Sequence, residues 1–224
     1  MYLVRTPSFL QRLLPTYTWR GQHTERVVYL TFDDGPIPEV TPWVLAQLAA
    51  YEAHATFFCV GENAARHPTI LNDIRAAGHT VGNHTYNHLN GWNTDLHDYL
   101  DNVDRCAKVV ESGLFRPPYG RLSPRKTFAL QRKYRIVMWD VLSGDFDQDL
   151  SPQACLANVL DNVNPGSIVV FHDSLKAERN LRFALPLLLA ALRAQGYRFE
   201  AIPSLSRERS IVNAGMAAQP LDSV

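Results

Sequence analysis

The sequence lacks several features that would place it in particular classes of protein. Its 22 basic residues balance its 22 acidic residues, so the formal net charge is zero. A neutral chain gives no support for a nucleic-acid footprint or for binding to an acidic membrane surface. No stretch approaches the roughly 20 apolar residues that a transmembrane helix needs. We therefore expect no nucleic-acid partner and no integral membrane segment.

Cysteine is also scarce. The chain of 224 residues has three, Cys59, Cys106 and Cys155, which are far apart and odd in number. This pattern argues against a disulfide framework, and without a CxxC pair there is no sign of a zinc knuckle. We expect three buried free thiols, which favours a reducing compartment.

The N-terminus, MYLVRTPSFLQRLLPTYTWRG, lacks the continuous apolar core and the small-residue cleavage site of a signal peptide. Its apolar runs are interrupted by Arg5, Pro7, Arg12 and Pro15. With no signal peptide and no membrane span in view, we expect a cytoplasmic protein.

Short apolar runs alternate with helix-like segments along most of the chain. Seven runs are candidate strands, at 27–32, 55–60, 80–81, 114–115, 135–141, 167–171 and 198–202. Continuous apolar runs are typical of parallel strands covered on both faces, and parallel strands need crossover helices. The sequence therefore predicts one α/β domain, with barrel and open sheet both compatible with the periodicity.

Three pairs, Thr41-Pro42, Ser123-Pro124 and Ser151-Pro152, place a capping hydroxyl before a proline at a predicted helix start. We see no repeat and no internal linker. The chain divides into an N-terminal extension at 1–26, a catalytic domain at 27–202 and a polar C-terminal tail at 203–224.

Residues suited to catalysis follow several of these runs. Asp33 and Asp34 end the first run, and adjacent side chains on an extended segment point to different sides. One carboxylate can then bind a metal while the other does acid–base work. His84 and His88 are four residues apart, which on a helical turn would let them share a metal ion.

Three further motifs follow later runs: Arg116-Pro117-Pro118-Tyr119-Gly120, Trp139 to Phe146, and Val170-Phe171-His172-Asp173. Each motif alone also fits an ordinary turn or a structural histidine. Together they place acidic, basic and imidazole groups at the ends of five predicted strands. In parallel α/β folds the active site lies beyond those ends, so the set indicates one catalytic site.

In this order the five motifs resemble those of the polysaccharide deacetylase family, also called carbohydrate esterase family four. TFDDGP at 31–36, HTYNH at 84–88 and RPPYG at 116–120 are close to its first three motifs, and the last two motifs match more loosely. The resemblance runs from about 27 to 202. It implies a distorted (β/α) barrel of about seven parallel strands that removes acetyl groups from N-acetylated sugars, such as chitin-oligosaccharide or peptidoglycan-type N-acetylglucosamine.

The resemblance also implies a divalent metal, with Zn²⁺ expected first and Co²⁺ or Ni²⁺ as alternatives. Its ligands would be Asp34, His84 and His88. Such a site leaves positions open for water and for the acetyl oxygen. The acetylated carbohydrate is the expected partner.

The remaining motif residues receive roles by the same resemblance. Asp33 would be the general base, oriented by Arg116, and His172 the general acid, paired with Asp145. The backbone N–H of Tyr119 would stabilise the oxyanion. The expected substrate contacts are Tyr119, Pro118, Phe146 and Val170.

The sequence departs from the family at three positions. Phe146 stands where tryptophan is usual, Leu142 where a second aspartate is frequent, and Val170 where leucine is usual. Two alternatives therefore stay open: a hydrolase of an O-acetyl ester or of a non-sugar amide or imide, and a non-catalytic carbohydrate-binding protein. The pair Asp33 and His172 argues against the second, because a binding module needs neither a base nor an acid.

Overall fold

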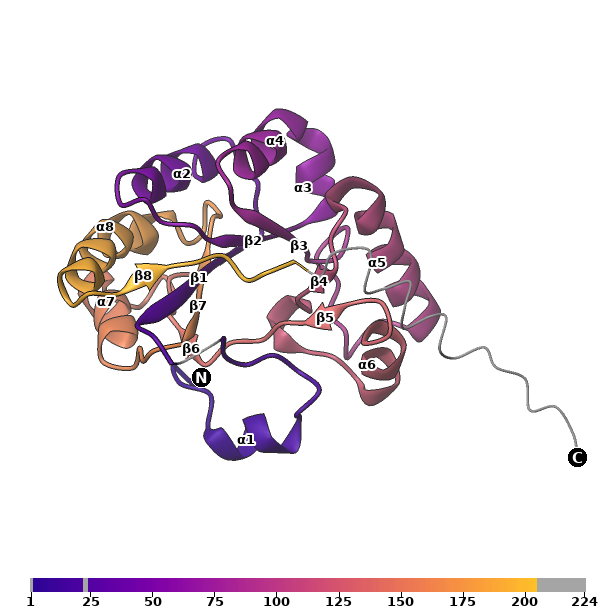
Figure 1. Cartoon of the computed structure of the whole chain (residues 1–224). Helices are drawn as coiled ribbons and strands as arrows, with labels where there is room; N and C mark the ends of the chain where they lie inside the picture. Colours follow the sequence, from indigo (N-terminus) through magenta and orange to yellow (C-terminus); the bar gives the residue numbers. More distant parts are fainter. Residues whose placement is uncertain (1, 22–23, 205–224) are drawn as a thin grey trace, which may run out of the picture.

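The computed structural model describes residues 2–21 and 24–204, so most of the predicted tail at 203–224 lies outside the described residues. The strands are β1 (Val27–Asp33), β2 (Thr56–Cys59), β3 (Thr80–Asn83), β4 (Leu114–Phe115), β5 (Arg135–Ile136), β6 (Val141–Leu142), β7 (Ile168–His172) and β8 (Arg198–Phe199). All their pairings are parallel, in the order β5-β4-β3-β2-β1-β7-β6, with β8 beside β1. Helices surround the strands (Figure 1).

The helices are α1 (Ser8–Leu13), α2 (Thr41–Ala49), α3 (Gly61–Arg66), α4 (Pro68–Ala76), α5 (Leu96–Val110), α6 (Pro124–Leu130), α7 (Pro152–Leu160), α8 (Glu178–Ala194) and the 3₁₀ helix η1 (Pro118–Gly120). Ser151 caps α7 as predicted, because its hydroxyl accepts the Ala154 N–H. Thr41 and Ser123 make no such capping bond. No helix in the described ranges is long and apolar enough to cross a membrane.

The sheet curls because its two edge strands follow one another in the chain. β5 ends at Ile136 and β6 begins at Val141, yet they stand at opposite ends of the strand order. A chain covers at most about 3.5 Å per residue, so the two edges lie within about 17 Å of each other. The prediction of one strand over 135–141 is wrong, because this run leaves one edge of the sheet and joins the other. The result is the predicted distorted barrel, with an opening between β5 and β6.

The N-terminal segment, residues 2–20, lies along this opening (Figure 1). The Thr6 N–H donates to the Asp140 carbonyl (2.9 Å), and the Leu142 N–H donates to the Val4 carbonyl (2.8 Å). Thr18 forms a parallel bridge with the chain between β5 and β6. The residues predicted as an extension are thus hydrogen-bonded to the strands that flank the opening.

The register of the strands brings the motif residues to one rim of the barrel. Asp33, the last residue of β1, lies opposite His172, the last residue of β7. Asn83 of β3 lies opposite Phe115 of β4, so the residues that follow these strands emerge side by side. β1 is buried along its whole length, which anchors the rim in the core. Cys59, Cys106 and Cys155 are buried and unpaired, as predicted.

Candidate active site

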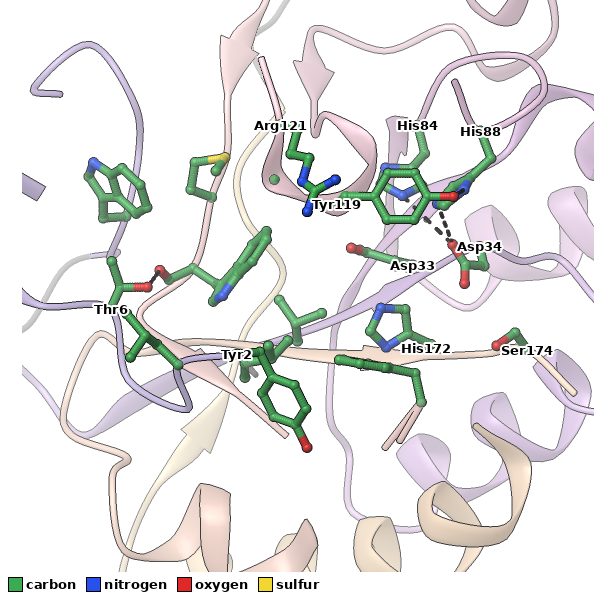
Figure 2. Close-up of a pocket in the computed structure, with 18 of the residues that line it drawn as sticks. Tyr2, Thr6, Asp33, Asp34, His84, His88, Tyr119, Arg121, His172 and Ser174 are labelled. Carbon is green, nitrogen blue, oxygen red and sulfur yellow. Dashed lines mark hydrogen bonds and ion pairs between the residues drawn. The ribbon is translucent and has the colours of Figure 1, made fainter. Parts of the chain in front are cut away.

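Asp34, His84 and His88 come together just beyond β1 and β3 (Figure 2). Asp34 Oδ1 lies 3.2 Å from His88 Nε2 and 3.7 Å from His84 Nε2. The ligand atoms of the three residues all lie within 4.8 Å of one another, and no other group of acidic, histidine or cysteine side chains within 2–21 and 24–204 has this spacing. One carboxylate and two imidazoles facing a cavity are typical of a catalytic metal site.

The two histidines do not share the helical turn that their spacing suggested. Thr85 and His88 have φ values of 63° and 59°, in the left-handed region, so the segment after β3 is a loop. Asp34 and Tyr119 also have positive φ, 83° and 61°. Such non-glycine conformations cost about 1–3 kcal/mol each and cluster at functional sites. The surrounding fold therefore holds a strained backbone at two of the three clustered residues, Asp34 and His88.

The protonation states of these side chains suit a cation. His84 Nδ1 lies 2.8 Å from the Arg116 carbonyl, so Nδ1 carries the proton and Nε2 presents its lone pair to Asp34. Burial lowers the pKa of His84 to about 4, which keeps the ring neutral at pH 7. Burial would raise the pKa of Asp34, but the adjacent His88 imidazole and the charge of His172 hold it well below its usual range.

The surroundings of Asp34 Oδ1 test whether a metal ion fits the three clustered residues. This oxygen is buried and has no hydrogen-bond donor among the described residues. A buried carboxylate oxygen that lies 3.7 Å from His84 Nε2 and 3.2 Å from His88 Nε2 without a hydrogen bond is unfavourable unless a positive charge compensates it. The donor set of Asp34, His84 and His88 therefore fits a divalent cation, with zinc favoured by the nitrogen ligands.

Asp33 is held by Arg116. Arg116 Nη1 donates to Asp33 Oδ1 at 2.7 Å and also to the Thr31 hydroxyl at 2.6 Å. The other guanidinium nitrogens donate to the carbonyls of Val137 (3.2 Å) and Met138 (3.0 Å). Burial lowers the pKa of Arg116 and Asp33 opposes this shift, so the guanidinium stays charged at neutral pH. These bonds fix the orientation of the Asp33 carboxylate.

His172 is held by Asp145. Its Nδ1 lies 2.8 Å from Asp145 Oδ1, and its backbone N–H donates to Asp145 Oδ2 at 2.7 Å. Burial alone would lower the pKa of His172, but the Asp145 carboxylate outweighs it and raises the pKa to about 10. The imidazolium form therefore persists at neutral pH and carries a proton at Nε2.

One cavity of about 710 Å³ contains the metal-ligand cluster, Asp33 and His172, a size usual for small-molecule sites. Tyr119, Phe146 and Val170, predicted to contact substrate, line it. Pro118 does not line the cavity and is buried, because the chain turns at Tyr119 and leaves the preceding prolines in the interior. The cavity thus collects every predicted site residue except the supporting Arg116 and Asp145, and Pro118.

Sequence reasoning missed the contribution of the N-terminal segment. Five of its residues line the cavity: Tyr2, Leu3, Thr6, Leu10 and Trp19. Their irregular spacing carries no period of a helix or a strand. Their position depends on the opening between β5 and β6, which no local sequence pattern predicts.

Asp173 is a second residue whose role was missed. It is buried directly after His172, and its Oδ1 accepts the Gly35 N–H at 3.0 Å. Its Oδ2 accepts the Thr41 hydroxyl at 2.5 Å, and Thr41 is itself the first residue of α2, with its hydroxyl oxygen accepting the Ile37 N–H. A Cβ on Gly35 would lie 1.9 Å from Asp173 Oδ2, so only glycine fits there. Asp173 therefore holds the turn that follows Asp34.

We expect Asp173→Ala to lower the free energy of unfolding by about 2–4 kcal/mol, because two buried donors lose their acceptor. Asp173→Asn, which keeps one acceptor oxygen for Gly35, should cost about half as much. Urea unfolding of the metal-free proteins measures both, so that metal loss does not contribute. A loss below about 1 kcal/mol for Asp173→Ala would show that the turn is held by other contacts.

Comparison with known proteins agrees with this geometry. The sequence pattern of the family described as polysaccharide deacetylase matches residues 20–139. The chain is similar to a peptidoglycan-N-acetylglucosamine deacetylase of Bacillus cereus, with 36% identity over 85% of this chain and 92% of the relative. It is also similar to a chitooligosaccharide deacetylase of Azorhizobium caulinodans, with 30% identity over 79% of this chain and 92% of the relative.

Among solved structures, the Bc1960 peptidoglycan N-acetylglucosamine deacetylase, in complex with 4-naphthalen-1-yl-N-oxidanyl-benzamide, is similar to this chain. The TM-score is 0.81 at 32% sequence identity, and the match covers 88% of this chain and 95% of that one. The likeness therefore extends over the barrel and not only over the motifs.

Proposed function

The chain belongs to the polysaccharide deacetylase family, and we propose that it is a metal-dependent hydrolase that removes the acetyl group from an N-acetylated amino sugar of the N-acetylglucosamine type. The observation that carries the proposal is the meeting of three groups in one cavity. These are the metal-ligand cluster, the anchored carboxylate of Asp33 and the protonated imidazole of His172. The names of the similar proteins support an N-acetylglucosamine substrate.

Asp34, His84 and His88 would hold the metal, for which we propose Zn²⁺ with Co²⁺ or Ni²⁺ as alternatives. A bound divalent cation polarises the acetyl carbonyl and lowers the pKa of water. The protein supplies the orientation of the ligands, since His84 is fixed through its Nδ1 by the Arg116 carbonyl.

Proton transfer falls to two residues on neighbouring strands. Asp33 takes the proton of the attacking water at Oδ2, because Arg116 occupies Oδ1. The water oxygen bonds to the acetyl carbon, and the backbone N–H of Tyr119 donates to the resulting oxyanion. His172 Nε2 then protonates the leaving nitrogen as the C–N bond breaks. The products are acetate and a free amine.

The acetyl methyl group needs an apolar pocket beside these residues. Phe146 and Val170 both line the cavity, and the Phe146 ring packs edge-on against His172 with 5.2 Å between centroids. We propose that these two side chains receive the methyl group. Both residues differ from the family pattern, but both are apolar, as the usual residues at these positions are.

The proposal is tested by acetate release from N-acetylglucosamine oligomers, with zinc, with cobalt and after chelation. We expect release that chelation abolishes and metal restores. If one ion is bound per chain and no acetate appears, the substrate is an ester or a non-sugar amide or imide instead. If neither metal binding nor release is found, the chain is a non-catalytic carbohydrate-binding member of the family.

The proposed acid makes a prediction about pH. Asp145→Asn should move the alkaline limb of the kcat/KM profile to lower pH, because the charge that raises the pKa of His172 to about 10 is removed. The imidazolium should then be lost at a lower pH, because the burial that lowers the pKa of His172 remains. At pH 8.5 we expect a loss of at least about 100-fold, which becomes smaller at pH 5.5. An equal loss at every pH would contradict the proposed role.

The same substitution tests the linkage with stability. Because the folded-state pKa of His172 lies above its unfolded value, the His172–Asp145 pair stabilises the fold fully below about pH 6.5. That contribution is lost as the pH rises through about 10. The difference in unfolding free energy between the parent and Asp145→Asn should therefore shrink at high pH, which urea unfolding at pH 6 and pH 10.5 measures.

A further inference from the structure

The cavity extends beyond the metal-ligand cluster toward the N-terminal segment. In Figure 2, Tyr2 and Thr6 lie across the cavity from His84 and His88. The lining on this far side is almost entirely apolar: Leu3, Leu10, Trp19, Met138, Trp139 and Leu142. We call these six residues the apolar wall.

Three polar side chains beside the apolar wall already have partners, and Arg121, which lies over the Trp92 ring, also lines the cavity. The Thr6 hydroxyl donates to the Trp139 carbonyl at 2.9 Å, and the Tyr2 hydroxyl donates to Asp147 at 3.0 Å. Trp19 Nε1 donates to the Leu14 carbonyl at 3.0 Å. A ligand hydroxyl placed here would lose its bonds to water and find few in exchange.

Two magnitudes decide which ligand group suits such a wall. A buried polar group without a partner costs about 1–3 kcal/mol, and a sugar ring carries several hydroxyls. A buried methylene group instead gains about 0.8 kcal/mol. The apolar wall therefore disfavours a second sugar ring and favours an alkyl group.

Exposed apolar side chains also gather in the N-terminal segment, which supplies three residues of the apolar wall. Leu3 lines the cavity and is 60% exposed. Phe9, Leu13 and Leu14, on or next to α1, are 66%, 71% and 40% exposed. Four of the nine large apolar side chains exposed within the described ranges thus belong to one segment of the chain. Exposed apolar surface that adjoins a ligand cavity marks a binding site.

Resting on the proposed function, we propose that the substrate is an amphiphile: an N-acetylated sugar with an apolar chain on its anomeric oxygen. Its acetyl group faces Asp34 and His172, and its chain lies along the apolar wall toward α1. The apolar wall and the catalytic residues line the same cavity. One ligand therefore carries both the alkyl chain and the acetyl group. The N-terminal segment is then part of the substrate site.

Three substrates test this inference on the zinc-loaded protein: the methyl and octyl glycosides of N-acetylglucosamine, the latter below its critical micelle concentration, and N,N′-diacetylchitobiose. If three of the added methylene groups are buried, kcat/KM should be about 50-fold higher for the octyl than for the methyl glycoside. The gain should come from a lower KM. The disaccharide should gain less than about threefold. Equal values for the two glycosides, or a larger gain for the disaccharide, would overturn the inference.

A pair of leucine substitutions locates the effect. Leu10→Ser changes the apolar wall and should reduce the octyl-to-methyl ratio of kcat/KM about tenfold. Leu187→Ser, the same change at an exposed site on α8 that does not line the cavity, should leave the ratio unchanged. If Leu10→Ser lowers kcat/KM for both glycosides equally, the wall does not hold the chain.

Binding separates this inference from the proposed function. Calorimetry with the zinc-loaded Asp33→Asn protein, whose turnover is expected to be about 10³-fold slower, gives the Kd of each glycoside, and we expect a Kd about 50-fold lower for the octyl glycoside. Tighter octyl binding without acetate release from any N-acetylated sugar would leave the apolar site standing and refute the deacetylase. Acetate release with equal Kd values for the two glycosides would support the deacetylase and refute the apolar site.

Discussion

Asp33→Asn is expected to lower kcat about 10³-fold while one metal ion stays bound per chain. The asparagine side chain is nearly isosteric with aspartate and keeps a carbonyl oxygen for Arg116, but it cannot take a proton from water at neutral pH. Asp33 is not one of the three clustered ligand residues, so metal content should not change. Acetate release under saturating substrate and elemental analysis of the dialysed protein measure the two quantities.

The substitution leaves the buried guanidinium of Arg116 without a full counter-charge, and this must be separated from the chemistry. Loss of one member of a buried pair can cost several kcal/mol of stability. The assay should therefore run well below the unfolding temperature of the variant. Asp104→Asn, which removes a surface carboxylate paired with Lys133, provides the matched control and should keep full activity. Activity of Asp33→Asn within tenfold of the parent would refute its role as the base.

His84→Ala is expected to abolish both metal binding and turnover. His84 presents its Nε2 to Asp34, and its removal leaves a carboxylate and one imidazole, too few for a catalytic zinc site. A ligand that binds only the folded state stabilises it, by about 4 kcal/mol at a thousandfold excess over Kd. Zinc should therefore raise the unfolding temperature of the parent protein and not that of the variant.

His97→Ala is the matched control, because His97 is exposed on α5 and does not belong to the cluster of Asp34, His84 and His88. It should keep both the zinc-dependent rise in unfolding temperature and the turnover. His84→Ala also removes a buried side chain, so the metal-free variant should be less stable than the metal-free parent. A zinc-dependent rise that persists in His84→Ala would place the metal elsewhere.

Much of the candidate site could be predicted from the sequence, for a physical reason. Asp33, Arg116 and His172 each follow a short apolar run, and parallel strands bring the residues after such runs to one rim. Residues with different proposed roles are also adjacent in the sequence, as are the base Asp33 and the metal-ligand candidate Asp34. Predictions that depended on local conformation were weaker: positive φ at Thr85 and His88 replaced the expected helical turn.

The way in which the barrel closes could not be predicted from local sequence patterns. The run 135–141 reads as one strand because its residues are apolar throughout most of its length, and only the position of both sheet edges divides it into β5 and β6. The N-terminal segment then covers the opening through bonds such as Thr6 to Asp140, which are separated by more than a hundred residues. Contacts of that range leave no periodic trace in the sequence.

The sequence by itself determined the parallel α/β architecture and the residues that meet at its rim, because both follow from local patterns of burial and from motif chemistry. Only the tertiary structure decided which surfaces complete the cavity. Asp173 holds the turn after Asp34, and Leu3, Leu10 and Trp19 form part of the apolar wall. Those roles depend on where distant segments pack, and packing is a property of the whole fold.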